Sequence, residues 1–109
     1  MTSNQYTGYV CEVTLQQPTQ GQYGLFGHLK IKLTSSPNCR DDEVPIVALY
    51  HLTQGAIVQD ADADFLLTEN QLMTLLLGYS AAAANRTRVR VNTKQFGGGL
   101  QILEITFLA

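Results

Sequence analysis

The sequence predicts a mainly β domain in which one helix covers an antiparallel sheet of five to six strands. Apolar and polar residues alternate along several segments, as in half-buried strands. One segment alone, about 69–84, combines helical periodicity with a capping motif at its start. At 109 residues, the chain has the length of one domain and can bury a core of its own.

The first half of the chain predicts strands. Residues 1–7 are polar, and we expect them to be flexible. Strands are predicted over 8–16 and 25–34, separated by a loop over 18–24, and the two should pair as an antiparallel hairpin. The inward-facing side chains are predicted to be Cys11, Val13, Leu15, Leu29, Ile31 and Leu33, and the outward-facing ones Val10, Glu12, Thr14, His28, Lys30 and Lys32. A third strand is predicted over 44–52, and Ile57 and Val58 suggest a short fourth.

The helix is the most clearly marked element. Thr68 and Gln71 have the spacing of a capping box, and Glu69 adds a negative charge where it suits the helix dipole. The helix should run from Glu69 to Ala84, with Asn85 as a left-handed stop residue. The face with the spacing of a buried stripe carries Leu72, Leu75, Leu76, Tyr79 and Ala83, and the other faces carry Met73, Leu77, Ala81, Ala82 and Ala84.

This helix has no charged residue between Glu69 and Arg86. A helix that is apolar nearly all round is normally covered on several sides. Two interpretations are open: the helix is sunk in its own core with alanine and serine facing water, or its second face packs against another subunit. We favour a homo-oligomer, whose interface would consist of Met73, Leu77, Ser80, Ala81 and Ala84.

The end of the chain predicts a second hairpin. Arg88 starts a strand in which Val89, Val91 and Thr93 alternate with polar residues. A turn at residues 97–99 leads to a last strand over 101–107, with Leu103, Ile105 and Phe107 on one face. The predicted order places the single helix between the third and fourth strands of an antiparallel barrel, which is the order of an OB-fold.

Composition limits the class of function. A net charge of −2 argues against a general nucleic-acid binder, and no apolar run is long enough to span a membrane. The N-terminus has no signal-peptide pattern, so we expect a cytoplasmic protein, or a secreted one if a signal has been removed. Cys11 and Cys39 are either a disulfide or two reduced thiols, and both alternatives stay open.

Residues suited to catalysis or metal binding are sparse. Carboxylates alternate from Asp60 to Asp64 as in a calcium loop, but Phe65 stands where that loop needs Gly. We therefore expect a solvated acidic loop and no cofactor. His28 and His51 have no metal-ligand spacing. With Cys11 they are the residues that a small enzyme or enzyme accessory would use, but Cys11 lies on a predicted apolar face, so we favour a non-catalytic protein.

Two further groups of residues suggest binding. Aromatic residues near strand ends, beside polar side chains, are suited to stacking against a sugar, and the candidates are Tyr9, Tyr23, Phe26 and Tyr50. A basic stripe suggests single-stranded nucleic-acid binding as an alternative, and it consists of Arg86, Arg88, Arg90 and Lys94. The stripe lacks interleaved aromatic residues, and its charges could instead pair with Glu104 and other acids across the sheet or at a subunit boundary.

The order of elements over about 9–107, with its single helix and two cysteines, resembles the B subunits of AB5-type bacterial toxins. The resemblance implies an OB-fold, assembly into pentameric rings with helices lining a central pore, and binding of cell-surface glycans. It rests on element order, and no binding residue of that family maps onto a position in this chain. Our leading expectation is a non-catalytic oligomeric module that binds carbohydrate.

Overall fold

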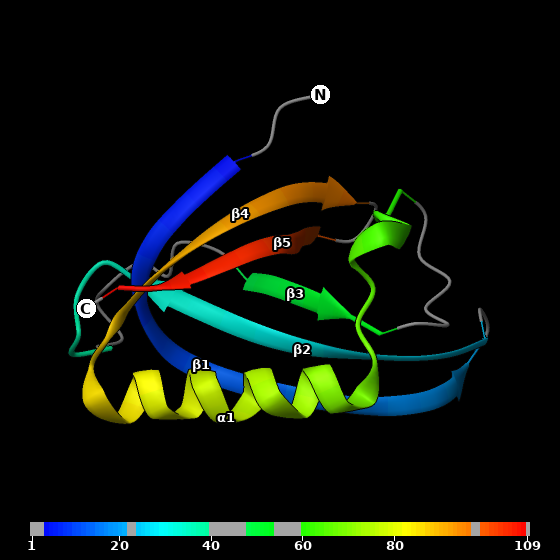
Figure 1. Cartoon of the computed structure of the whole chain (residues 1–109), viewed down its shortest axis with the longest axis horizontal. Coiled ribbons are helices and arrows are strands. Elements are labelled where there is room, and N and C mark those ends of the chain that lie inside the picture. The colour runs from blue at the N-terminus through cyan, green and yellow to red at the C-terminus, as the bar shows by residue number, and fades with distance from the viewer. Residues whose placement is uncertain (1–3, 22–23, 40–47, 54–59, 97–98, 109) are drawn as a thin grey trace.

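The computed structural model describes residues 4–21, 24–39, 48–53, 60–96 and 99–108. This part of the chain is mainly β with one α-helix, as predicted (Figure 1). Its elements are β1 (Asn4–Gly21), β2 (Gly24–Thr34), β3 (Ala48–Leu52), the 3-10 helix η1 (Ala63–Phe65), α1 (Glu69–Asn85), β4 (Arg88–Phe96) and β5 (Gly99–Phe107). The predicted residues 44–47 of the third strand, and the suggested strand at Ile57 and Val58, lie outside the described residues.

The five described strands form a sheet that closes on itself in the order β1-β2-β3-β5-β4. The long strand β1 closes the sheet because it pairs with β2 along one part and with β4 along another. The prediction of a wholly antiparallel sheet is wrong at one seam, since β3 and β5 are parallel where Tyr50 pairs with Gln101. α1 carries the chain from β3 to β4, and the hairpin that follows returns β5 beside β3 in the same direction.

β1 is longer than predicted at both ends. Asn4 pairs with Thr93 of β4, so residues 4–7 belong to the strand and are not the flexible tail that we expected. At the other end, the strand continues through Pro18 to Gly21. A register shift between Gln16 and Thr19 accommodates the proline, which has no N–H to contribute to the ladder.

Two irregularities change which side chains face the interior. In β1 the register shifts between Val10 and Glu12, so Cys11 is an extra residue. Val10, predicted to point outward, is therefore buried at 3% exposure, and Val13 also packs against the core. In β5 the shift falls at Leu103, because Glu104 pairs with Asn92 while Ile102 pairs with Thr93. Contrary to prediction, Ile102 is buried and Leu103 is only half-buried.

The core fills the interior of the closed sheet, and α1 packs over it alongside β1 (Figure 1). The predicted inward residues of β2, Leu29, Ile31 and Leu33, are fully buried. The other buried core residues are Val10, Leu49, Leu72, Tyr79, Ala82, Val89, Val91 and Ile102.

The start of α1 is as predicted. Thr68 Oγ1 accepts from the Gln71 amide at 3.2 Å, and the Thr68 amide donates to Gln71 Oε1 at 2.9 Å. The end differs by one residue, because Asn85 is still helical and Arg86 takes the left-handed conformation at φ 53°. The buried face is also rotated slightly: Ala82 is buried, whereas Ala83, which we predicted to be buried, is exposed.

Cys11 and Cys39 form a disulfide, with their Cα atoms 5.5 Å apart. The bond ties the irregularity in β1 to the segment that follows β2. Beside it, the Thr34 hydroxyl donates to the Ser36 carbonyl at 2.7 Å, which helps to hold the start of that segment.

Candidate functional site

An aromatic cluster of His28, Tyr50 and Phe96 lies on the outer face of the closed sheet. His28 and Tyr50 point outward because their chain neighbours Leu29 and Leu49 are fully buried inside. The ring centroids of His28 and Tyr50 are 5.2 Å apart, and those of Tyr50 and Phe96 are 5.9 Å apart. Both contacts are edge-to-face, a favoured arrangement of aromatic pairs. Side chains from β2, β3 and β4 therefore meet at Tyr50.

Gly99 of β5 makes room for the Tyr50 ring. A Cβ atom at this position would lie only 2.9 Å and 3.2 Å from two atoms of that ring. The ring thus occupies the space that a side chain at residue 99 would need, and it lies over the backbone of β5. Tyr50 is partly buried, and Phe96 beside it is buried at 8% exposure.

The acidic loop before α1 is fixed beside this cluster. Gln101, the β5 partner of Tyr50, is fully buried and forms two hydrogen bonds with the backbone of Asp62. The Asp62 amide donates to Gln101 Oε1 at 2.6 Å, and Gln101 Nε2 donates to the Asp62 carbonyl at 3.1 Å. This double contact is hereafter the Gln101–Asp62 clamp. It brings residues 60–65 next to the strand residues that carry the aromatic cluster.

The loop presents carboxylates and one aromatic ring. Asp62 Oδ1 accepts from the Asp64 amide at 3.1 Å and so begins η1. Asp60 and Asp64 are exposed, and Phe65 is 40% exposed. Among the described residues, no three His, Cys, Asp or Glu side chains are placed to hold a metal ion together. The carboxylates are suited to accept hydrogen bonds from hydroxyl groups.

Charge around the cluster is mixed. Burial, and to a lesser extent the nearby Lys30, lower the pKa of His28, so its ring is neutral at pH 7. Lys30 is the cross-strand neighbour of Tyr50 on β2. Further along β2, Lys32 forms a 3.0 Å salt bridge with Glu12. The outer face at Tyr50 therefore carries an aromatic ring, a neutral imidazole and a cation, and the backbone of the acidic loop is held next to it by Gln101.

Of the four predicted ligand-binding aromatics, Tyr50 belongs to the cluster. Tyr9 lies elsewhere, on β1 between Thr34 and Arg88. Phe26 lies in β2 opposite Thr19, and its side chain, like all of Tyr23, is outside what the structure describes.

The prediction from sequence did not group His28, Phe96 or Gln101 with Tyr50. Strand alternation placed His28 outward, and Phe96 directly precedes the glycine run. These two features place His28 and Phe96 beside Tyr50 only once the strand order is known.

The residues considered for catalysis do not come together. Cys11 is in the disulfide, so its sulfur is not a free thiol. His51 is buried at 5% exposure, and its Nε2 lies 2.5 Å from the hydroxyl of Tyr79 on α1. His28 is on the outer face with Tyr50.

The predicted basic stripe is only partly continuous. Arg88 and Arg90 are exposed on the outer face of β4, but Arg86 ends α1 and Lys94 is half-buried. Among the described residues, no basic side chain of the stripe forms a salt bridge with Glu104, and the salt bridge found is Lys32–Glu12. Glu104 Oε1 instead accepts a hydrogen bond from Asn92 Nδ2 at 2.8 Å.

All five side chains of the predicted subunit interface are exposed. We call this set the exposed helix face, and it consists of Met73, Leu77, Ser80, Ala81 and Ala84. Leu77 is 70% exposed and Met73 is 48% exposed. The patch continues towards β5, because the Phe107 ring lies against α1 at Gly78 and is itself 42% exposed. Large apolar side chains gathered in this way are typical of interaction surfaces.

Comparison with known proteins gives no match to a family model, to a curated protein or to a solved structure. In the part of the chain that the structure describes, no helix is long and apolar enough to cross a membrane.

Proposed function

We propose that the protein is a non-catalytic, OB-like binding module that self-associates and binds a carbohydrate. The OB-like assignment is supported by the closed order β1-β2-β3-β5-β4 and by the position of α1 between β3 and β4. In such barrels, the face of the second and third strands binds oligosaccharides or oligonucleotides. His28 and Tyr50 lie on the outer face of those two strands.

The observation that carries the carbohydrate proposal is the Tyr50 ring, held over Gly99 beside the clamped acidic loop. An aromatic ring can pack against the apolar face of a sugar, while carboxylates accept hydrogen bonds from its hydroxyl groups. The same carboxylates disfavour nucleic acid, because they would repel phosphate groups close to the cluster. The net charge of −2 also disfavours nucleic-acid binding.

Self-association is supported by the exposed helix face. It offers two large apolar side chains, Met73 and Leu77, next to small residues that allow another chain to approach closely. No charged residue between Glu69 and Arg86 would oppose that approach. Covering this face would remove apolar surface from water, which favours association.

The disulfide supports a secreted or otherwise oxidising location for this module, because such bonds persist mainly outside reducing compartments. In that location, a cell-surface or extracellular glycan would be accessible to the aromatic cluster.

The carbohydrate proposal is tested with a glycan array probed by labelled wild-type protein, Tyr50→Ala and Tyr9→Ala. We expect wild type to bind a defined set of glycans, and Tyr50→Ala to weaken that binding about tenfold because a stacking ring is lost. Tyr9→Ala is the matched control, since it removes a tyrosine whose strand neighbours are Thr34 and Arg88 and keeps the cluster.

Two results would contradict this proposal. Full binding by Tyr50→Ala with loss in Tyr9→Ala would place the site on β1 and β4. Binding of single-stranded oligonucleotides that weakens steeply between low and moderate salt, with no glycan bound, would favour the nucleic-acid alternative through Arg88 and Arg90.

A further inference from the structure

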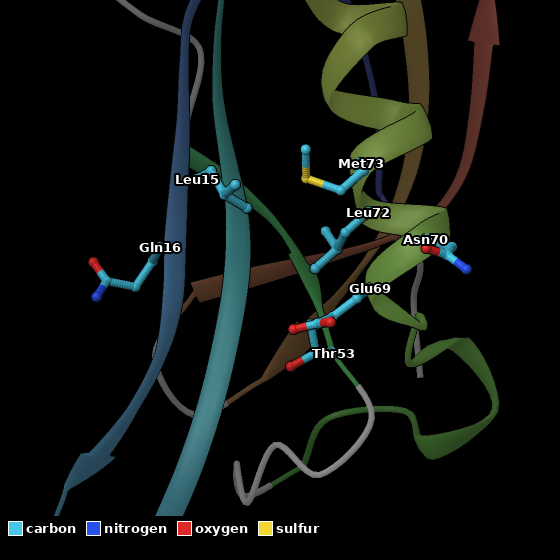
Figure 2. A pocket seen from close by; sticks show the side chains of 7 residues that line it. All are labelled: Leu15, Gln16, Thr53, Glu69, Asn70, Leu72 and Met73. Atoms are coloured by element: carbon cyan, nitrogen blue, oxygen red, sulfur yellow. The ribbon is translucent and has the colours of Figure 1, made fainter.

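A cleft lies between β1 and the first turns of α1 (Figure 2). Its volume is about 510 Å³, within the range of small-ligand pockets. Leu15, which reaches the cleft from β1, pairs with the buried Leu29 and so lies on the inner face of the sheet. The cleft is therefore separate from the aromatic cluster, which lies on the outer face.

The walls of the cleft are aliphatic. Leu15 from β1 and Met73 from α1 point towards each other across the opening, and Leu72 lies beside Met73 on the helix (Figure 2). Met73 is 48% exposed, and a methionine side chain adapts readily to the shape of what it contacts. These walls are suited to a short hydrocarbon chain.

One end of the cleft is polar and negatively charged. The Glu69 carboxylate points from the first turn of α1 into the space between helix and sheet, next to the side chain of Thr53 (Figure 2). No lysine, arginine or histidine is among the residues described as lining the cleft. A carboxylate at the end of an aliphatic cleft, with no basic side chain among its described lining, matches a ligand whose hydrocarbon chain ends in a cation.

We propose that this cleft binds an alkylammonium group. The hydrocarbon chain lies between Leu15 and Met73, and the ammonium group donates hydrogen bonds to the Glu69 carboxylate. Two sources carry this chemistry: a free alkylamine, and the lysine side chain of another polypeptide. Both would use the same walls and the same carboxylate.

The test is an NMR titration that follows the methyl signals of Met73 and Leu15. The probes are n-butylamine, n-butanol, butyrate and N-acetyl-lysine-methylamide. We expect saturable shifts with butylamine, weaker binding of butanol and none of butyrate. Glu69→Gln should weaken the affinity for butylamine about fivefold, because a partly exposed ion pair is lost. The affinity for butylamine should then be similar to that for butanol. Glu104→Gln is the control, because it neutralises an exposed carboxylate on β5 outside the cleft.

Equal binding of butyrate and butylamine would overturn the proposal, as would unchanged butylamine binding in Glu69→Gln or the absence of saturable shifts. Binding of the lysine derivative identifies a polypeptide side chain as a competent source, whereas binding of butylamine alone identifies a free amine. The glycan array does not enter this test, so the amine site stands or falls separately from the carbohydrate proposal. Met73 belongs both to this cleft and to the exposed helix face.

Discussion

His51 and Tyr79 form a buried polar contact between β3 and α1. His51 Nε2 and the Tyr79 hydroxyl are 2.5 Å apart, and the two rings also contact each other at 5.6 Å between centroids. Burial lowers the pKa of His51 to about 4, and burial raises the pKa of Tyr79. Both side chains are therefore uncharged at neutral pH, and the helix is held to the sheet by a neutral hydrogen bond.

We predict that acid destabilises the protein through His51. Its pKa is 6.5 in the unfolded chain and about 4 in the folded one, so below pH 6.5 the unfolded chain binds more protons. The stabilising contribution of neutral His51 is complete above pH 6.5 and is lost towards pH 4. Urea unfolding should show a loss of about 2 to 3 kcal/mol between pH 7.5 and 4.5 that His51→Gln does not share. An identical pH dependence in both proteins would contradict this account.

At the residue scale, alternation predicted most inward side chains but failed at two positions. One extra residue at Cys11 and one at Leu103 reverse the alternation within their strands. Val10 and Ile102 are consequently buried against expectation. The position of a bulge depends on how a strand pairs with its neighbour, so the apolar pattern of one strand does not by itself locate it.

At the scale of elements, the capping box of α1 accounts for the position at which the helix begins. We predict that Thr68→Ala lowers the free energy of unfolding by about 1 kcal/mol, because the Gln71 amide loses its acceptor. Urea denaturation measures the change. The matched control is Thr74→Ala inside the helix, where the hydroxyl donates to the Asn70 carbonyl on the exposed surface. Alanine is the better helix former there, so this variant should be neutral or slightly more stable.

An equal loss of stability in both threonine variants would mean that the cap contributes nothing beyond an ordinary helix surface contact.

The helix itself was predictable because its signals are local. The cap and the buried stripe lie within one continuous segment. The end was less predictable, since Asn85 is the commoner left-handed residue but Arg86 adopts that conformation.

At the scale of the whole molecule, the element order was predictable and the long-range contacts were not. The parallel seam of β3 and β5 and the Gln101–Asp62 clamp join residues far apart in sequence, 39 positions apart in the clamp. The candidate site depends on those contacts. Tyr50 was identified from sequence, but its position beside Phe96 and the acidic loop follows from the closed strand order.

The proposed binding module self-associates through the exposed helix face, and the mass of the protein in solution tests this most directly. Light scattering after gel filtration should give a mass that is a multiple of the 12.0 kDa chain. A mass of about five chains would agree with the resemblance to toxin B subunits. Leu77→Glu should reduce the mass to that of one chain. The substitution at this 70% exposed position should change stability by no more than about 0.5 kcal/mol.

Gln95→Glu, which adds the same charge at an exposed position on β4, should leave the wild-type mass unchanged. A wild-type mass of one chain would contradict self-association. Loss of the fold in Leu77→Glu would show that this side chain belongs to the core, and the interface would then have to lie elsewhere. A wild-type oligomer together with a folded, monomeric Leu77→Glu is the result that the account predicts.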